Sequence, residues 1–109
     1  ICTHLEVSSA ELRLAQVKFI QKKVKSIKNP VFLAGDMNAK PDSPEMAFLR
    51  KGWDDLTNRE LTYSTKEPSI KIDYIYCRKG SGVKLIDTKV CHDTVLSDHF
   101  PVVANIEIN

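Results

Sequence analysis

The chain of 109 residues has room for one small domain. Its composition, 42% hydrophobic and 28% charged, is that of a globular protein and excludes a disordered, collagen-like or coiled-coil chain. The net charge of +2 does not by itself indicate binding to nucleic acid or to a membrane, and no apolar segment approaches the roughly 20 residues that span a bilayer.

The N-terminal third predicts a strand, a helix and a second strand. Residues 1–5 are strand-like, and a capping box formed by Ser8 and Glu11 begins a helix that we expect to run to about Lys28. The expected apolar face of this helix comprises Leu12, Ala15, Phe19, Ile20 and Ile27. Residues 31–35 are continuously apolar, which is typical of a strand buried on both faces. This strand–helix–strand order predicts a parallel pair of strands.

The rest of the chain predicts one short helix and an antiparallel group of strands. The helix is expected over residues 45–51, between Pro44 and Gly52. A hairpin turn is expected at residues 79–82, and the strands are expected over residues 70–77, 83–91 and 100–108. We find no repeat and no linker in the sequence, so we predict a single α/β domain over residues 1–109.

Two polar residues follow the apolar strand directly. Asp36 and Asn38 lie just beyond its carboxyl end, where the sheets of α/β proteins bind ligands. Their oxygens suit Mg²⁺ or Mn²⁺ better than zinc, and Gly35 lets the backbone approach a bound group. The alternative is an Asx turn that closes the strand, because Asp and Asn are common turn residues.

A second polar pair, Asp98 and His99, comes immediately before the last strand. Imidazole is the side chain best suited to proton transfer near neutral pH, and the neighbouring carboxylate is a potential metal ligand. The alternative interpretation is a capped turn with a surface His.

Asp73 lies within an apolar strand, where a carboxylate is costly unless it has a partner. A protonated His is such a partner, and an active-site His usually needs an orienting carboxylate. We therefore predict a dyad of Asp73 and His99. The alternative is an ion pair of Asp73 with Lys71 or another surface cation. His4, at the end of the first strand, is more often structural than catalytic when it is taken alone.

The chain resembles the endonuclease/exonuclease/phosphatase superfamily in four segments that occur in the family's order. This superfamily includes deoxyribonuclease I, apurinic/apyrimidinic endonucleases, neutral sphingomyelinases and inositol polyphosphate 5-phosphatases. Each segment alone is a weak signal, but together they cover essentially the whole chain. The segments are Thr3-His4-Leu5, Gly35-Asp36-Met37-Asn38, Ile72-Asp73-Tyr74-Ile75 and Ser97-Asp98-His99-Phe100-Pro101.

The resemblance implies a phosphoester hydrolase (a phosphodiesterase, phosphatase or nuclease) that depends on Mg²⁺ or Mn²⁺. It implies that His99, held by Asp73, is the base that deprotonates the attacking water. It also implies that His4 contacts a phosphate oxygen and helps to stabilise charge or to protonate the leaving group.

The resemblance also implies a metal site. It places Asp98 there and assigns Asp36 and Asn38 to the binding of metal or of the scissile phosphate, with Asp36 also able to orient the nucleophile. The expected partners are a phosphoester substrate, with nucleic acid as one option, and no membrane span. The alternative is a non-catalytic module that keeps the fold and binds a partner.

The implied fold is two packed sheets flanked by helices, of which this chain resembles only the C-terminal half. We expect a mixed, largely antiparallel sheet with one long and one short helix. The family's N-terminal half, with its metal-binding Glu, has no counterpart here, so we expect this fragment to be an incomplete enzyme. We also expect its exposed sheet face to bind that half or a second copy of the chain.

Overall fold

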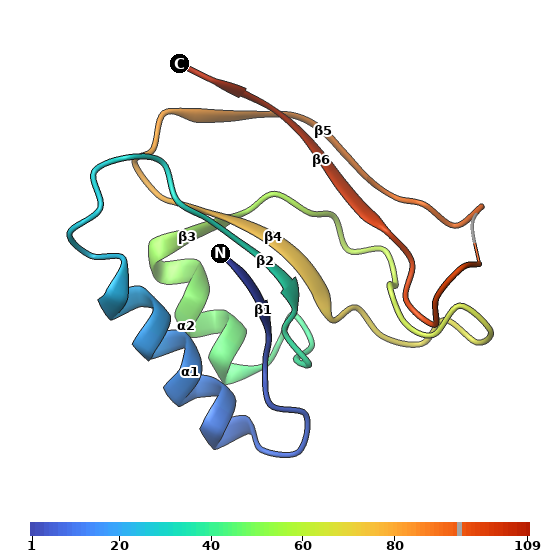
Figure 1. Ribbon diagram of the computed structural model, residues 1–109. Coiled ribbons are helices and arrows are strands. Elements are labelled where there is room, and N and C mark those ends of the chain that lie inside the picture. The colour runs from blue at the N-terminus through green and yellow to red at the C-terminus, as the bar shows by residue number, and fades with distance from the viewer. Residues whose placement is uncertain (94) are drawn as a thin grey trace.

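Two sheets and two helices make up residues 1–93 and 95–109, the part of the chain that this computed structural model describes (Figure 1). The observed class is therefore mixed α/β, as the sequence predicts. In chain order the elements are β1 (Cys2–His4), α1 (Ala10–Lys23), β2 (Phe32–Asp36), α2 (Pro44–Gly52), β3 (Trp53–Asp55), β4 (Asp73–Arg78), β5 (Val83–Val90) and β6 (Val102–Ile108).

The larger sheet has the strand order β1-β2-β4-β3. β1 and β2 are parallel, which confirms the predicted pair, whereas β4 runs antiparallel to both β2 and β3. β5 and β6 form a separate antiparallel sheet. Both helices cover one face of the larger sheet, and the β5–β6 pair lies on the other side (Figure 1).

The core fills the space between the larger sheet and the helices. Successive side chains of a strand point to opposite faces, so alternate residues of β2 and β4 enter this core and their neighbours face away from the helices. The most deeply buried core side chains are Leu33, Tyr74, Tyr76 and Trp53 from the sheet, and Val17, Met46 and Leu49 from the helices.

Helix α1 begins and ends at different residues from those predicted. Its N-cap is Ser9 and not Ser8, because the Ser9 hydroxyl accepts the Leu12 N–H at 3.1 Å while Ser8 donates to the Glu6 carboxylate. The helix ends at Lys23 and not near Lys28. The chain beyond it is held instead by the Arg78 guanidinium, which donates to the carbonyls of Val24, Ile27 and Asn29.

The predicted apolar face of α1 was also wrong, except at Ile20, which packs against the core. Leu12 and Phe19 are 53% and 60% exposed, whereas Val17 is 1% exposed and Val24 is likewise buried. The sequence of the helix contains two apolar stripes that share Ile20. One is the predicted face, and the other includes Val17 and Val24, which lie in the core beneath the sheet. Helical spacing identifies both stripes but does not say which one the sheet will cover.

The predicted hairpin between β4 and β5 does not form. β4 pairs with β2 and β3, and β5 pairs with β6, so residues 79–82 carry the chain from one sheet to the other. The edge of β4 is taken by β3, a strand that the sequence did not predict. β2 also differs from its prediction, because Leu33 is buried against the helices but Phe32 and Ala34 on the other face are only half-buried.

Among residues 1–93 and 95–109, neither helix is long enough or apolar enough to cross a bilayer. This agrees with the absence of a spanning segment in the sequence.

Candidate active site

Three of the predicted site residues form one row across the larger sheet. His4 pairs with Asp36 between β1 and β2, and Asp36 pairs with Asp73 between β2 and β4. Directly paired residues project from the same face of a sheet. Their neighbours Gly35 and Tyr74 belong to the opposite, helix-covered face, so the three side chains share the open face at one edge of the sheet.

Gly35 allows the strands of this row to lie close together. Its φ is +140°, a conformation that L side chains rarely adopt, and a Cβ atom there would lie 1.9 Å from the Thr3 carbonyl oxygen. The sequence led us to expect a glycine that admits a bound group. The close neighbour in the structure is the backbone of β1.

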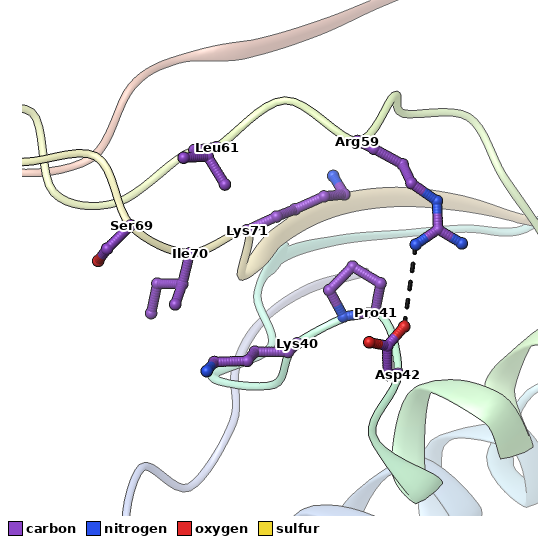
Figure 2. Close-up of a pocket in the computed structure, with 8 residues that line it drawn as sticks. All are labelled: Lys40, Pro41, Asp42, Arg59, Leu61, Ser69, Ile70 and Lys71. Atoms are coloured by element: carbon purple, nitrogen blue, oxygen red, sulfur yellow. Dashed lines mark ion pairs between the residues drawn. The ribbon is translucent and has the colours of Figure 1, made fainter.

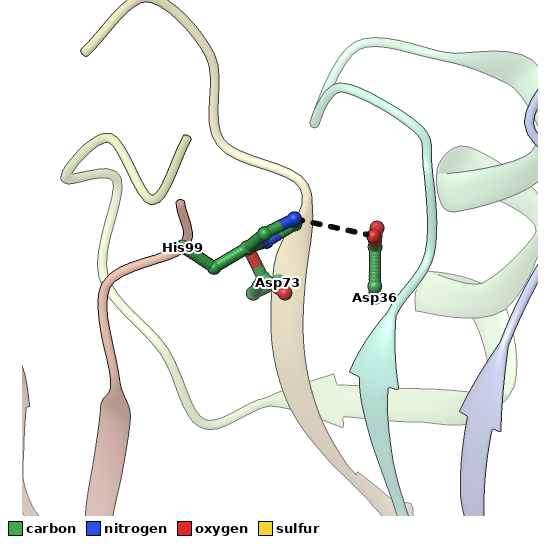
Figure 3. A group of neighbouring side chains, drawn as sticks. All are labelled: Asp36, Asp73 and His99. Carbon is green, nitrogen blue, oxygen red and sulfur yellow. Dashed lines mark hydrogen bonds and ion pairs between the residues drawn. The ribbon is translucent and has the colours of Figure 1, made fainter. Parts of the chain in front are cut away.

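His99 joins the row from the segment before β6 (Figure 3). Its Nδ1 lies 2.8 Å from Asp73 Oδ2, and its Nε2 lies 3.7 Å from Asp36 Oδ2. The structure thus brings together the two residues of the predicted dyad. Lys71, the alternative partner of Asp73, donates instead to the Asp73 main-chain carbonyl at 2.9 Å and to Thr57 Oγ1 at 2.8 Å.

The surroundings of His99 make it a stronger base than a free imidazole. Burial lowers the pKa of His99, but the hydrogen bond and charge of Asp73, with the charges of Asp36 and Asp98, raise it by more. The net pKa lies above the ordinary value for His. Because Nδ1–H donates to Asp73, Nε2 is the nitrogen that carries the lone pair of the neutral ring, and it faces Asp36 Oδ2.

Asp36 serves the turn and the site with different oxygens. Its Oδ1 accepts the Asn38 N–H at 2.8 Å, which is the Asx turn that the sequence offered as the alternative. Its Oδ2 faces two imidazoles, with His4 Nε2 at 3.4 Å and His99 Nε2 at 3.7 Å. Asn38 has a φ of +48°, and its Nδ2 donates to the Leu5 carbonyl at 2.8 Å. Asn38 therefore ties the end of β2 to the end of β1.

One group of side chains in the described residues has the spacing of a metal site. Asp36, Asp73 and His99 each offer a ligand atom, and these atoms lie within 4.8 Å of one another. This group differs from the predicted set, which combined Asp36 with Asn38 and Asp98. The Asp98 side chain is exposed, and its main-chain carbonyl accepts the Thr65 N–H at 3.0 Å.

Thr62 and Tyr63 hold His99 in place, and the sequence did not mark either of them as functional. The Thr62 carbonyl accepts the Phe100 N–H at 2.8 Å, and Tyr63 forms an isolated β-bridge with His99. The Tyr63 ring also packs against the imidazole, with 4.9 Å between the ring centroids. Their residue types are ordinary for a short strand, so only the tertiary pairing reveals their contact with the dyad.

A hollow of about 210 Å³ adjoins this edge of the sheet (Figure 2). Lys40 and Arg59 are exposed cationic side chains that line the hollow. Lys40 lies two residues after Asn38, and the Arg59 guanidinium lies 3.9 Å from the Asp42 carboxylate. Lys71 also lines it. Burial lowers the pKa of Lys71, although Asp55 and Asp73 partly oppose this. The hollow therefore places positive charge next to the row of site residues.

The fold and the site together define a class of α/β proteins in which a His–Asp pair lies at the edge of a mixed sheet. Residues 3–99 match the model of the endonuclease/exonuclease/phosphatase family. The chain belongs to this family. No curated protein is significantly similar to it in sequence.

Solved structures share the fold over nearly the whole chain. A conserved protein of unknown function from Enterococcus faecalis V583 is 26% identical, with a TM-score of 0.83 over 99% of this chain and 49% of its own. A family protein from Bacteroides thetaiotaomicron is 21% identical, with a TM-score of 0.84 over 99% and 49%. A mannosyl-6-phosphatase from the same species is 18% identical, with a TM-score of 0.74 over 98% and 50%. The chain spans about half the length of these structures.

Proposed function

We propose that this chain carries the base and the phosphate contacts of a metal-dependent phosphoester hydrolase. The observation that supports this best is the 2.8 Å contact between His99 Nδ1 and Asp73 Oδ2, with Nε2 directed toward Asp36 across the site (Figure 3). The family, by its name, comprises enzymes that act on phosphoesters, and membership favours this proposal over a non-catalytic binding module.

In the proposed mechanism His99 is the general base. Asp73 holds the Nδ1–H tautomer, so that Nε2 is free to accept a proton from the attacking water. The Asp73 carboxylate then stabilises the imidazolium that forms. The hydrogen bond and the charge of Asp73 favour this role, because they stabilise the protonated ring.

His4 and Asn38 are the two residues that we propose as contacts to the phosphate. His4 is exposed, and its Nε2 lies 3.4 Å from Asp36 Oδ2, so it can reach a phosphate group that sits over the row. We propose that it stabilises charge on a phosphate oxygen or protonates the leaving group. Asn38 shapes the same edge, and its side chain is the second proposed contact to the scissile phosphate.

The donor set fits a hard divalent cation. Asp36, Asp73 and His99 each offer a ligand atom within 4.8 Å of the others, so hard carboxylate oxygens converge at this point. Mg²⁺ is usually held by one or two carboxylates with phosphate oxygens and water, and Mn²⁺ prefers similar ligands. We propose Asp36 as its principal ligand, with Asn38 and Asp98 as further oxygen donors. When bound, the cation would neutralise charge on the phosphate.

The proposed substrate is a general phosphomonoester or phosphodiester. Lys40 and Arg59 line the hollow beside the row and would attract a second anionic group of such a substrate. The net charge of +2 gives little support to a dedicated nuclease. The mannosyl-6-phosphatase with the same fold illustrates phosphatase chemistry on this scaffold.

We also propose that the open face of the larger sheet needs a protein partner. The face carries the half-buried apolar residues Phe32, Ala34 and Ile75 next to the row. Apolar surface of this kind usually marks a protein contact. The further half of a family domain and a second copy of this chain are both suitable occupants.

Hydrolysis of bis-p-nitrophenyl phosphate and p-nitrophenyl phosphate tests the proposal, with Mg²⁺, Mn²⁺ or EDTA present. We expect activity with either metal when the chain is extended by the further half of the family domain, and none with EDTA. Asp36→Asn should weaken Mn²⁺ binding, measured by calorimetry, as well as turnover. Asp87→Asn on β5 is the control, since this exposed carboxylate lies outside the site, and it should change neither. Activity that persists in EDTA, or a folded protein that is inactive under all conditions even when extended by the further half of the family domain, would contradict the proposal.

A further inference from the structure

One buried residue contacts both of the segments that carry the His99–Asp73 pair. We propose that Thr62 is a positioning residue that sets His99 against Asp73. This inference rests on the proposed function only in assuming that the His99–Asp73 pair is used for catalysis. The contacts of Thr62 with the two segments do not depend on that function.

The Thr62 side chain holds the segment that carries Asp73. Its exposed fraction is 0%, and its Oγ1 accepts the N–H groups of Ile72 at 3.1 Å and of Asp73 at 3.2 Å. A buried amide needs an acceptor, and one hydroxyl here serves two successive amides. The Thr62 hydroxyl thereby fixes the backbone at the first residue of β4.

The main chain of the same residue holds the segment that carries His99. Its carbonyl accepts the Phe100 N–H at 2.8 Å, one residue after His99. Tyr63 continues this contact through its β-bridge and its ring packing with His99. The N–H groups of Thr62 and Tyr63 both donate to the Ile70 carbonyl, which ties the two residues back to the chain before β4.

Asp73 and His99 lie 26 residues apart in sequence, with Asp73 at the start of β4 and His99 in the segment before β6. No ladder of strand pairing between β4 and β6 appears in the described part of the chain, so their relative position depends on what lies between them. Thr62 supplies a direct connection, with its hydroxyl on one side and its carbonyl on the other. A shift of either segment would lengthen the 2.8 Å contact between Nδ1 and Oδ2.

The test compares Thr62→Val, which removes the hydroxyl and keeps the shape, with Thr62→Ser, which retains a hydroxyl. ¹⁵N-resolved NMR of the histidine rings reports the tautomer of His99 and the exchange of its Nδ1 proton. Val17→Ala is the matched control, because Val17 is buried on the helix side of the sheet and its truncation lowers stability without touching the site.

We expect Thr62→Val to lose the slowly exchanging Nδ1 proton of His99, and Thr62→Ser and Val17→Ala to keep it. Where turnover is measurable, Thr62→Val should lower kcat about 10- to 100-fold with little change in KM, as expected for a residue that orients a catalytic side chain. An unchanged His99 signal in Thr62→Val, or an equal loss in Val17→Ala, would overturn the inference.

A wild-type measurement covers the case in which Thr62→Val does not fold. Hydrogen exchange should show the amides of Asp73 and Phe100 and the His99 Nδ1 proton opening at one common rate, because all three depend on Thr62. Unrelated rates would refute the proposal. The NMR and exchange readouts need no turnover, so a protein without hydrolase activity but with a Thr62-dependent His99 signal would contradict the proposed function alone.

Discussion

The two faces of the larger sheet are built from the same strands but differ in almost every property. On the helix-covered face, Leu33 and Tyr74 pack into a closed apolar core. On the open face, Asp36 and Asp73 lie in one row with His4, and His99 contacts Asp73 from the segment before β6. Strand alternation separates the two sets, so that one face forms the apolar core and the other carries the titratable side chains of the proposed site.

The difference has a practical consequence for mutation. A change on the helix-covered face should cost stability and leave the geometry of the row intact. A change in the row should affect chemistry more than stability, because its residues are only partly buried. The expected effects on stability follow, from the largest to the smallest.

The largest loss is expected at the buried ion pair between the helices. Arg13 Nε lies 2.8 Å from Glu45 Oε2, and Glu45 is almost fully buried. Arg13→Met leaves that carboxylate without its partner, which should cost about 3–5 kcal/mol in the free energy of unfolding. Urea denaturation measures this, and Arg13→Met/Glu45→Gln should recover part of the loss. A cost below about 1 kcal/mol for Arg13→Met would show that the pair is not buried in solution.

Truncation of β2 and β4 side chains compares the faces directly. Leu33→Ala, on the covered face, should cost about 2–5 kcal/mol because it leaves a cavity in the core. Ile75→Ala, on the open face, should cost about 1 kcal/mol, since the side chain is only half-buried. Equal losses in urea denaturation would mean that the open face is covered in solution.

Acid should weaken the covered face through Glu45. Burial raises the pKa of Glu45, but hydrogen bonds from its own backbone amide, Arg13 and Ser43 lower it by more, so the net pKa is below the ordinary value. A depressed pKa adds stability that is complete above the unfolded-state pKa of about 4.3 and is lost as the pH falls through the lower folded-state value. Glu45→Gln should flatten the stability profile over that range. An unchanged profile would contradict this assignment.

The smallest effect concerns the start of α1. Ser9→Ala removes the observed N-cap and should cost about 0.5–2 kcal/mol, whereas Ser8→Ala should stay within about 0.5 kcal/mol. Thermal unfolding of the two variants measures the difference. A larger loss for Ser8→Ala than for Ser9→Ala would show that Ser8 is the N-cap, as the predicted capping box requires.

The sequence predicted those features that local chemistry determines. The carboxylate of Asp73 in an apolar strand requires a partner, and the structure provides His99. The apolar run before Asp36 and the helix before it predict a parallel pair, which β1 and β2 form. Both predictions depend on residue type and short-range order, which are visible in the chain itself.

The remaining features depend on tertiary structure. Two apolar stripes on α1 satisfy helical spacing equally well, and the sheet covers the one with Val17. β3 and β5 are both able to pair with β4, and β3 takes the edge. Thr62 has no chemical signature of a site residue, because its importance comes from where its hydroxyl and carbonyl meet two distant segments.

The most direct test is the turnover of His99→Ala beside His92→Ala, measured on bis-p-nitrophenyl phosphate with Mg²⁺ in a protein that is extended by the further half of the family domain. His92 is the matched control, since it is an exposed imidazole near the Leu61 carbonyl and outside the row. The account predicts that His99→Ala lowers turnover about 10²- to 10⁴-fold while His92→Ala stays near the wild-type rate. A His99→Ala protein that retains the wild-type rate would contradict the assignment of the open face as the catalytic face.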